Sequence, residues 1–390
     1  MEEQFGDIRP YHDHEVRPVV ERLLQDDEFI GSLAALRLPR LTQRFPALVR
    51  MLVRWVARRE LRTAHDIDSV QDLVKRYMDR MIERCTDSFT VSGLERLPAD
   101  QPYLFMSNHR DIALDPAFIN YALYRNDHDT VRIAIGDNLL SKPFAADLMR
   151  LNKSFIVKRS AKGPRQMLAA YKTLSAYIRH SITVDRSPIW IAQREGRAKD
   201  GLDRTEVAVI KMIAMAQDKA SESFAEFIRQ LRIVPVAISY EFDPCDELKA
   251  RELHERATRG SYAKAEHEDL RSIGLGIAGS KGDVHVSFGE PLTGDYADAD
   301  AVAAEIDRQI ISLYVLHPSN FAAYHALHGT WPELSCGADG SVFKPEAHRA
   351  VIERFEQRIA ALPPELRPYA LTIYANPVIS KLELASPVAA

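Results

Sequence analysis

The 390-residue sequence contains only three cysteines, Cys85, Cys245 and Cys336, and they lie far apart. Without a CxxC pair, neither a disulfide framework nor a thiolate zinc site is expected, and this content fits a reducing compartment. Long apolar runs are also missing, because none reaches the roughly 20 residues of a membrane-spanning helix. The acidic, proline-containing start MEEQFGDIRPYHDHEV argues against a secretory signal. We therefore expect a soluble or membrane-peripheral protein.

A strong excess of one charge is absent as well. The 51 basic and 55 acidic side chains leave a formal net charge of −4. A general nucleic-acid-binding protein would normally carry a basic excess, so no nucleic-acid partner is expected. Hydrophobic residues make up 46% of the chain, which is enough for a substantial core and excludes wholesale disorder.

The apolar pattern predicts three successive regions. Residues 1–84 lack β-rich runs and read as helical. Residues 85–295 alternate short apolar runs with longer helical stretches, which is typical of an α/β layer. Residues 296–390 return to helical patterns, and their proline-dotted tail, 363–390, is expected to run over the surface. The expected fold is a mostly parallel mixed sheet flanked by helices, with helical N- and C-terminal regions.

The central region supplies the individual elements. The expected strands are 88–91, 103–107, 130–135, 154–157, 189–192, 233–239 and 283–288. The expected helices between and after them are 116–124, 141–151, 164–182, 206–218, 300–315 and 345–362. A GxGxxG string at 274–279 leads into a strand instead of following one, so it is not a dinucleotide-binding fingerprint.

The most informative segment is 103–118, YLFMSNHRDIALDPAF, in which an apolar strand ends in Ser107, Asn108 and His109. Ligands bind at such strand ends in α/β sheets. A histidine there can act as a general base, because imidazole accepts protons near neutral pH. A nearby carboxylate would fix its tautomer and stabilise the imidazolium. The alternative is that His109 only caps or packs.

Further blocks follow this segment in order: SFIVKR at 154–159, QREGR at 193–197 and IVPVAISYE at 233–241. With residues 88–110 they resemble the glycerolipid acyltransferase family over about residues 85–295. The resemblance implies transfer of an acyl group from acyl-CoA or acyl carrier protein to glycerol-3-phosphate or 1-acylglycerol-3-phosphate. The donor is then a cosubstrate, and neither a metal, another cofactor nor a covalent acyl-enzyme is expected.

The spacing of the first block departs from the family pattern. Five residues separate His109 from Asp115, where the family has four, and Asp111 lies closer. In a continuous helix neither carboxylate would face the histidine. Asp115 directly precedes Pro116, a pair typical of an N-cap and a first helical residue. We therefore expect the helix to begin at Pro116 and residues 109–115 to turn back, which favours Asp115 as the partner and leaves Asp111 as the alternative.

Phosphate recognition is predicted from the basic residues. No acidic residue lies between Leu148 and Val184, whereas eight basic ones do, which indicates a local electropositive surface. The family resemblance places acceptor binding at Arg159, and we include Lys158 beside it. In the third block, Glu195, Gly196 and Arg197 are expected to form a tight turn that binds substrate, although a plain surface turn is the alternative.

The segment Arg37–Arg62 carries eight arginines and one acid. Arg50, Arg54 and Arg58 recur every four residues, and the apolar side chains Leu48, Leu52, Trp55 and Val56 mostly lie opposite. Such a basic amphipathic helix is typical of binding to anionic lipid, or it packs on the domain as an ordinary helix. We expect a cytoplasmic protein attached peripherally to the inner face of the cell membrane.

These observations predict an O-acyltransferase of phospholipid biosynthesis in which His109, aided by Asp115, removes a proton from the acceptor hydroxyl. Two alternatives remain. One is a noncatalytic membrane-binding module on the same scaffold, and the other is a hydrolase acting on thioesters.

Overall fold

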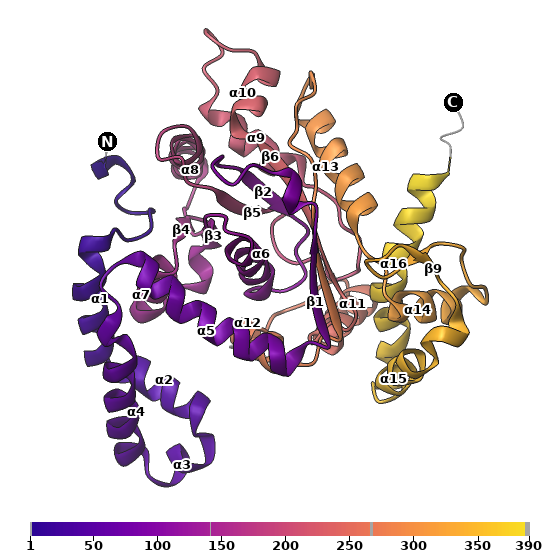
Figure 1. Ribbon diagram of the computed structural model, residues 1–390, viewed down its shortest axis with the longest axis horizontal. Coiled ribbons are helices and arrows are strands. Elements are labelled where there is room, and N and C mark those ends of the chain that lie inside the picture. The colour runs from indigo at the N-terminus through magenta and orange to yellow at the C-terminus, as the bar shows by residue number, and fades with distance from the viewer. Residues whose placement is uncertain (1, 141, 266–267, 387–390) are drawn as a thin grey trace. The chain divides into compact units, whose positions relative to one another are not determined.

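The computed structural model describes residues 2–140, 142–265 and 268–386 (Figure 1). The chain forms two compact units. Unit 1 contains Met1–Met78 and Arg132–Tyr177, and unit 2 contains Asp79–Val131 and Ile178–Ala390. Their boundaries fall within the helices α5 (Ile67–Cys85) and α8 (Pro164–Thr183). The predicted division into 1–84, 85–295 and 296–390 follows the sequence and stays a prediction.

Unit 1 is mainly helical, as predicted for the N-terminal residues. Its two strands, β3 (Arg132–Gly136) and β4 (Ser154–Val157), pair in parallel. Its remaining helices are α1 (Asp13–Gln25), α2 (Asp27–Arg37), α3 (Pro39–Arg44), α4 (Pro46–Glu60) and α7 (Pro143–Leu151). The sequence predicted a helix from Ser141, a residue that lies outside the described ones.

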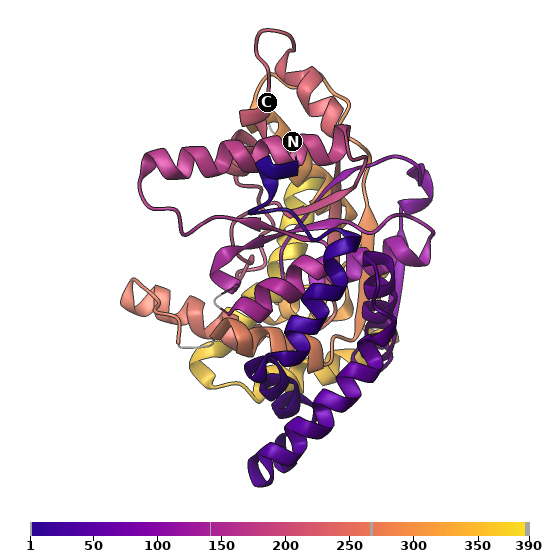
Figure 2. The same ribbon diagram turned by 90° about the vertical axis from the view of Figure 1, so that its left-hand side faces the viewer.

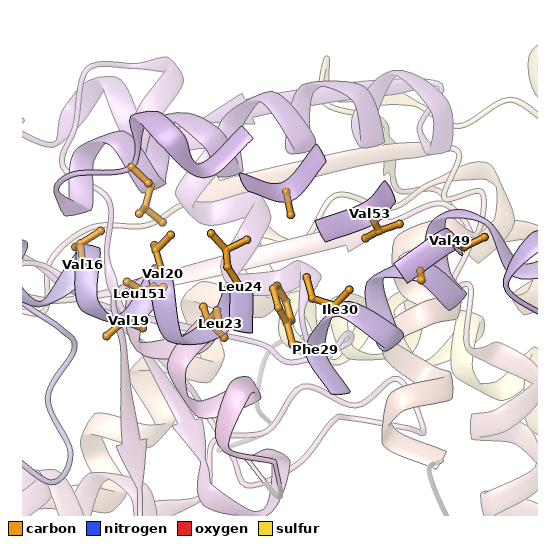
Figure 3. Packing of buried hydrophobic residues seen from close by; sticks show 14 residues of the cluster. Val16, Val19, Val20, Leu23, Leu24, Phe29, Ile30, Val49, Val53 and Leu151 are labelled. Carbon is orange, nitrogen blue, oxygen red and sulfur yellow. The ribbon is translucent and has the colours of Figure 1, made fainter. Parts of the chain in front are cut away.

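One apolar cluster holds the helices of unit 1 together (Figure 3). Val16 and Val20 of α1 pack with Ile30 of α2 and with Val49 and Val53 of α4. These side chains recur at three- and four-residue spacing, so each helix turns one apolar stripe inward. The same helices are the indigo elements of Figure 2.

The sheet of unit 2 confirms the predicted mixed, mostly parallel α/β fold. Its strands lie in the order β1 (Ser88–Ser92), β7 (Asp283–Phe288), β6 (Ile233–Tyr240), β2 (Leu104–Ser107) and β5 (Ile189–Ala192). All neighbours are parallel except β6 and β7. Because β5 and β6 both run parallel to β2, their carboxyl ends share one edge with the end of β2, where ligands of α/β sheets bind. All residues of β2 and β6 are buried, as expected of central strands.

Helices surround this sheet and form a further C-terminal group. They are the end of α8 with α6 (Leu114–Arg125), α9 (Val207–Ile213), α10 (Phe224–Leu231), α11 (Asp246–Arg259), α12 (Glu268–Ala278), α13 (Ala299–Leu313), α14 (Pro318–His328), α15 (Arg349–Ala360) and α16 (Arg367–Ala385). Residues 274–278 of the discounted glycine string lie in α12, and Gly279 directly follows it, so the string does not form a loop between a strand and a helix. A short hairpin, β8 (Ser335–Cys336) with β9 (Ser341–Val342), was not predicted.

The prediction for the tail was wrong. Instead of running over the surface, residues 367–385 form α16, which packs on α14 and α11 (Figure 1). Ile373, Tyr374 and Val378 are buried there. Pro368 lies in the first turn of α16. Backbone N–H groups in the first turn have no acceptor within the helix, so a proline, which lacks the N–H, is favourable there and does not end the helix. Residues 387–390 of the predicted tail lie outside the described ones.

If α16 belongs to the core, Ile373→Ala should lower the free energy of unfolding by about 2–4 kcal/mol, because it leaves a cavity. Leu384→Ala is the matched control, since Leu384 lies on the same helix and is 43% exposed. We expect it to cost less than about 1 kcal/mol. Chemical denaturation measures both values, and equal losses would contradict the placement of α16.

Candidate functional site

The loop after β2 is fixed by Asn108. Its side-chain amide donates to the carbonyl of Ile238 at 3.0 Å and accepts from the N–H of Ile238 at 2.8 Å. The side-chain amide of Asn108 therefore takes the place of a backbone hydrogen-bond partner for β6, just beyond the last residue of β2. Its Nδ2 also donates to Asp203 at 3.2 Å. These bonds hold the next residue, His109, at the edge of the sheet.

His109 is bonded to Asp115. Its Nδ1 lies 2.8 Å from Asp115 Oδ2, and the carboxylate is completely buried. The same oxygen accepts the backbone N–H groups of Arg110 and Asp111 at 2.6 and 2.9 Å. The other oxygen, Oδ1, accepts the hydroxyl of Tyr240 at 2.7 Å. Since the other partners of this carboxyl group all donate to it, we assign the proton of the bond to Nδ1 of His109.

The opposite nitrogen of His109, Nε2, then carries a lone pair. Among the described residues it makes no hydrogen bond, and 13% of the side chain is exposed. The ring meets the indole of Trp190 edge-on, with 5.7 Å between centroids. The imidazole is thus held from one side by Asp115 and Trp190, and Nε2 is available to a substrate hydroxyl.

The structure decides which carboxylate contacts His109, and it corrects the predicted start of the helix. Helix α6 begins at Leu114 instead of Pro116, and its N-cap is Ala113. The sequence suggested that Asp115 caps the start of this helix, but Asp111 does so instead. Its Oδ1 accepts the N–H groups of Ala113 and Leu114, each at 2.9 Å. Because residues 109–113 form a turn that is not helical, five intervening residues still bring Asp115 to the imidazole. Burial and the nearby Asp115 raise the pKa of Asp111.

The buried side chain of Arg110 holds the loop after β2 in place. The side chain is 5% exposed, and its guanidinium donates to Asp203 at 2.6 Å and to the carbonyl of Gly201 at 3.1 Å. It also lies over the ring of Tyr314, 5.4 Å from the centroid. Burial opposes the charge, but Asp203 raises the pKa of Arg110 above its ordinary value, so the guanidinium stays protonated.

A buried lysine connects this loop to the C-terminal helices. Lys249 is 1% exposed, donates to the carbonyl of Arg110 at 2.8 Å and forms an ion pair with Asp243. The N–H of Asp243 donates to the hydroxyl oxygen of Tyr374 at 2.8 Å, and that hydroxyl donates to Asp246 at 2.8 Å. Although burial raises the pKa of Asp243, Lys249 outweighs it and the pKa is lowered. Helix α16 therefore supports the loop after β2 through Asp243 and Lys249, without contacting His109 itself in the contacts described.

The turn after β5 lies beside the same loop. The N–H of Ala198 donates to the carbonyl of His109 at 2.7 Å, which joins the backbone of this turn to the backbone of the loop at His109. Gly196 has a φ of +71°, a conformation that favours glycine. Glu195 is exposed, and its backbone N–H donates to Glu206 at 3.1 Å.

Arg197 differs from an ordinary surface arginine. It is 8% exposed, and one terminal nitrogen, Nη2, donates to Ser272 at 3.3 Å. The other, Nη1, is buried without a hydrogen-bond partner in the part of the chain that the structure describes. A buried cation without a full set of acceptors is costly unless an anion completes it. Arg197 is therefore suited to bind a phosphate.

Lys158 and Arg159 belong to unit 1, directly after β4. Both are exposed, and Lys158 forms an ion pair with Asp7 at 3.3 Å. The backbone N–H of Arg159 donates to Asp137 at 3.1 Å, which fixes the chain there. Their predicted role in binding substrate stays a prediction.

Two cavities in unit 2 lie apart from these side chains. One of about 40 Å³ is lined by Tyr103 and His128, among others, and one of about 600 Å³ by Arg186 and Arg229. Neither is lined by His109, so the candidate site is defined by its hydrogen bonds and not by a cavity.

Residues 88–239 match the family model Acyltransferase. Human dihydroxyacetone phosphate acyltransferase is 21% identical over 210 residues, which is 54% of this chain and 29% of the relative. The bovine protein is 22% identical over 203 residues, 52% of this chain and 28% of its own. The matched segment thus spans less than a third of these relatives.

Among solved structures, the 1-acyl-sn-glycerophosphate (LPA) acyltransferase PlsC from Thermotoga maritima is similar to this chain with a TM-score of 0.37 and 12% identity. The alignment covers 73% of this chain and 95% of that one.

Sequence reasoning missed several residues of the site. Arg110, Asp203 and Lys249 received no role, and Tyr240 was noted only as part of the fourth block. The only signal for these residues in the sequence was that they are charged residues within largely apolar surroundings.

Proposed function

We propose that the chain carries a domain of the glycerolipid acyltransferase family and that it transfers an acyl group from a thioester to the hydroxyl of a phosphorylated glycerol-type acceptor. The observation that carries the proposal is the bond from His109 Nδ1 to the buried Asp115, which leaves Nε2 as a base. General-base catalysis by a positioned histidine requires this arrangement.

In the proposed reaction, Nε2 of His109 accepts the hydroxyl proton while the acceptor oxygen attacks the thioester carbonyl. A carbon–oxygen bond forms, the carbon–sulfur bond breaks, and the imidazolium returns its proton to the leaving thiolate. Asp115 stabilises the imidazolium between these events. The products are an ester and a free thiol, and the acyl group passes directly from sulfur to oxygen.

The acceptor is proposed to be held by its phosphate. Arg197, with its unpartnered nitrogen, would bind phosphate oxygens beside His109. Gly196 would allow the turn and Glu195 would orient the acceptor, whereas a role for Lys158 and Arg159 of unit 1 in binding substrate stays a prediction. Glycerol-3-phosphate, 1-acylglycerol-3-phosphate and dihydroxyacetone phosphate share the required phosphate and hydroxyl, and the third is suggested by the names of the relatives.

Acyl-CoA and acyl carrier protein both supply the thioester. A thioester hydrolase would release thiol without an acceptor, and a noncatalytic module would bind lipid without releasing thiol. The free Nε2 of His109 and the unpartnered nitrogen of Arg197 together favour transfer.

His109→Ala should lower kcat by at least about a thousandfold, because the acceptor hydroxyl loses its base. The initial rate of ester formation measures the effect. His65→Ala, at an exposed histidine outside the site, is the control and should match the unchanged protein. Near-normal transfer by correctly folded His109→Ala would rule out the mechanism.

Arg197→Ala should raise the acceptor KM about 10- to 100-fold and change kcat less, since charged hydrogen bonds of this kind contribute roughly 1.5–3 kcal/mol. Arg194→Ala is the matched control, because Arg194 lies in the same turn and only reaches Glu206, at 3.9 Å. We expect the control to change KM less than about threefold. An effect confined to the KM of the acyl donor would reassign Arg197 to donor binding.

The proposed membrane contact involves α3 and α4. Along α4, Val49, Val53 and Ala57 are buried, which agrees with the packed alternative. A second stripe on the helix is 49–64% exposed and consists of Leu48, Met51, Leu52 and Trp55. Leu41 and Phe45 extend it, each 49% exposed. Within the described ranges, no helix is long and apolar enough to cross a bilayer.

Exposed arginines accompany this stripe, namely Arg40, Arg44, Arg50, Arg58 and Arg59. Exposed apolar side chains beside several cations match an anionic lipid surface, where the apolar groups enter the interface and the arginines meet headgroups. We therefore assign α3 and α4 to peripheral membrane binding in the proposed function, which brings the enzyme to the lipids that it makes.

The double variant Leu48→Ser/Leu52→Ser should bind vesicles of phosphatidylglycerol and phosphatidylcholine at least about tenfold more weakly, because apolar burial in the interface is lost. Co-sedimentation measures the partition coefficient. Leu270→Ser, at a leucine of α12 that is 64% exposed, is the control and should bind normally. Unchanged binding by the double variant would exclude this surface.

A further inference from the structure

Tyr240 is the last residue of β6 and is 6% exposed. Its hydroxyl donates to Asp115 Oδ1 at 2.7 Å, and its ring packs near Phe118, with 5.9 Å between centroids. It lies just beyond the family match, which ends at residue 239. The parallel pairing of β2 with β6 brings this strand end to the catalytic loop.

Building on the proposed function, we propose that Tyr240 is a positioning residue: its hydroxyl holds Asp115 and thereby sets how strongly this carboxylate stabilises protonated His109. Two hydrogen bonds thus connect Tyr240 to Asp115 and Asp115 to His109. The three residues come from β6, from α6 and from the loop after β2.

The two oxygens of Asp115 are used unequally. Oδ2 accepts three donors, from His109, Arg110 and Asp111, whereas Oδ1 accepts only Tyr240. Without the hydroxyl, a completely buried carboxylate oxygen would lose its one partner, which is costly. The bond also fixes the plane of the carboxyl group and hence the direction in which Oδ2 meets the imidazole.

Tyr240 remains a donor throughout the working pH range. Burial and the adjacent Asp115 raise the pKa of its phenol well above the ordinary value. The other charged groups around Asp115 are Asp111, Arg110, Asp243 and Lys249, and all remain in a Tyr240→Phe variant. A change in that variant therefore reports the hydroxyl alone.

The direction of the effect follows from the charges. When the hydroxyl is removed, Asp115 is less stabilised and attracts the imidazolium more strongly. His109 then keeps its proton up to a higher pH, so its unprotonated form, which is the base, forms only at that higher pH. The acidic limb of the kcat/KM profile should move to higher pH by about half a unit or more.

The experiment compares Tyr240→Phe with Tyr11→Phe, which also removes a hydroxyl that donates to a buried aspartate, Asp147, at 2.7 Å, and which belongs to unit 1. Both should lose similar stability, which makes the second the control for a structural role. Acyl transfer is measured against pH, and the ring of His109 is titrated by NMR after labelling histidine with ¹³C. Its signal is assigned by its loss in His109→Gln.

We expect an upward shift of both the profile and the His109 titration in Tyr240→Phe, a kcat lowered about 3- to 30-fold and an acceptor KM within about twofold. Tyr11→Phe should retain the pH behaviour of the unchanged protein. An unshifted Tyr240→Phe, or equal shifts in both variants, would overturn the inference. If the unchanged protein transfers no acyl group, the proposed function fails, and the NMR titration still decides whether Tyr240 is coupled to His109.

Discussion

A single buried carboxylate organises the catalytic loop. Asp115 has no exposed surface, and an ion in that position is tolerated only when hydrogen bonds replace water. Two backbone N–H groups, one imidazole and one phenol supply them. Each bond also restrains its donor, so the residues that stabilise the charge are also positioned by it. His109 is the only one of these side chains that is partly exposed.

A set of buried charged residues, some of them outside the family match, supports the loop that contains His109. Arg110 pairs with Asp203 within the family match, whereas Lys249 and the C-terminal Tyr374 lie beyond it. Removing one member of a buried pair is costly, because the other charge is left without a partner. This gives residues 296–390 a structural task that their sequence did not indicate. Helix α16 stabilises the turn at 243–246, and Lys249 passes that support to the carbonyl next to His109.

The fold could be predicted because parallel strands buried on both faces are continuous apolar runs, visible in residues 189–192 and 233–239. The position of His109 at a strand end followed from the same pattern. Asp115 was chosen because the pair Asp115–Pro116 predicted a turn before the helix; the turn is present, although the helix already begins at Leu114. The remaining contacts could not be found this way. Tyr240 meets Asp115 over 125 positions, and Lys249 meets Arg110 over 139. The prediction for the tail was wrong for a local reason: its prolines suggested a coil, although Pro368 lies in the first turn of α16.

The account depends on His109 activating an acceptor hydroxyl and not water. The most direct measurement is mass spectrometry of the products formed from the purified protein, a long-chain acyl thioester and glycerol-3-phosphate, 1-acylglycerol-3-phosphate or dihydroxyacetone phosphate. The account predicts one ester for each thiol released, and thiol release only when an acceptor is present. Thiol released at the same rate without an acceptor, or lipid binding without any ester from any donor, would contradict it.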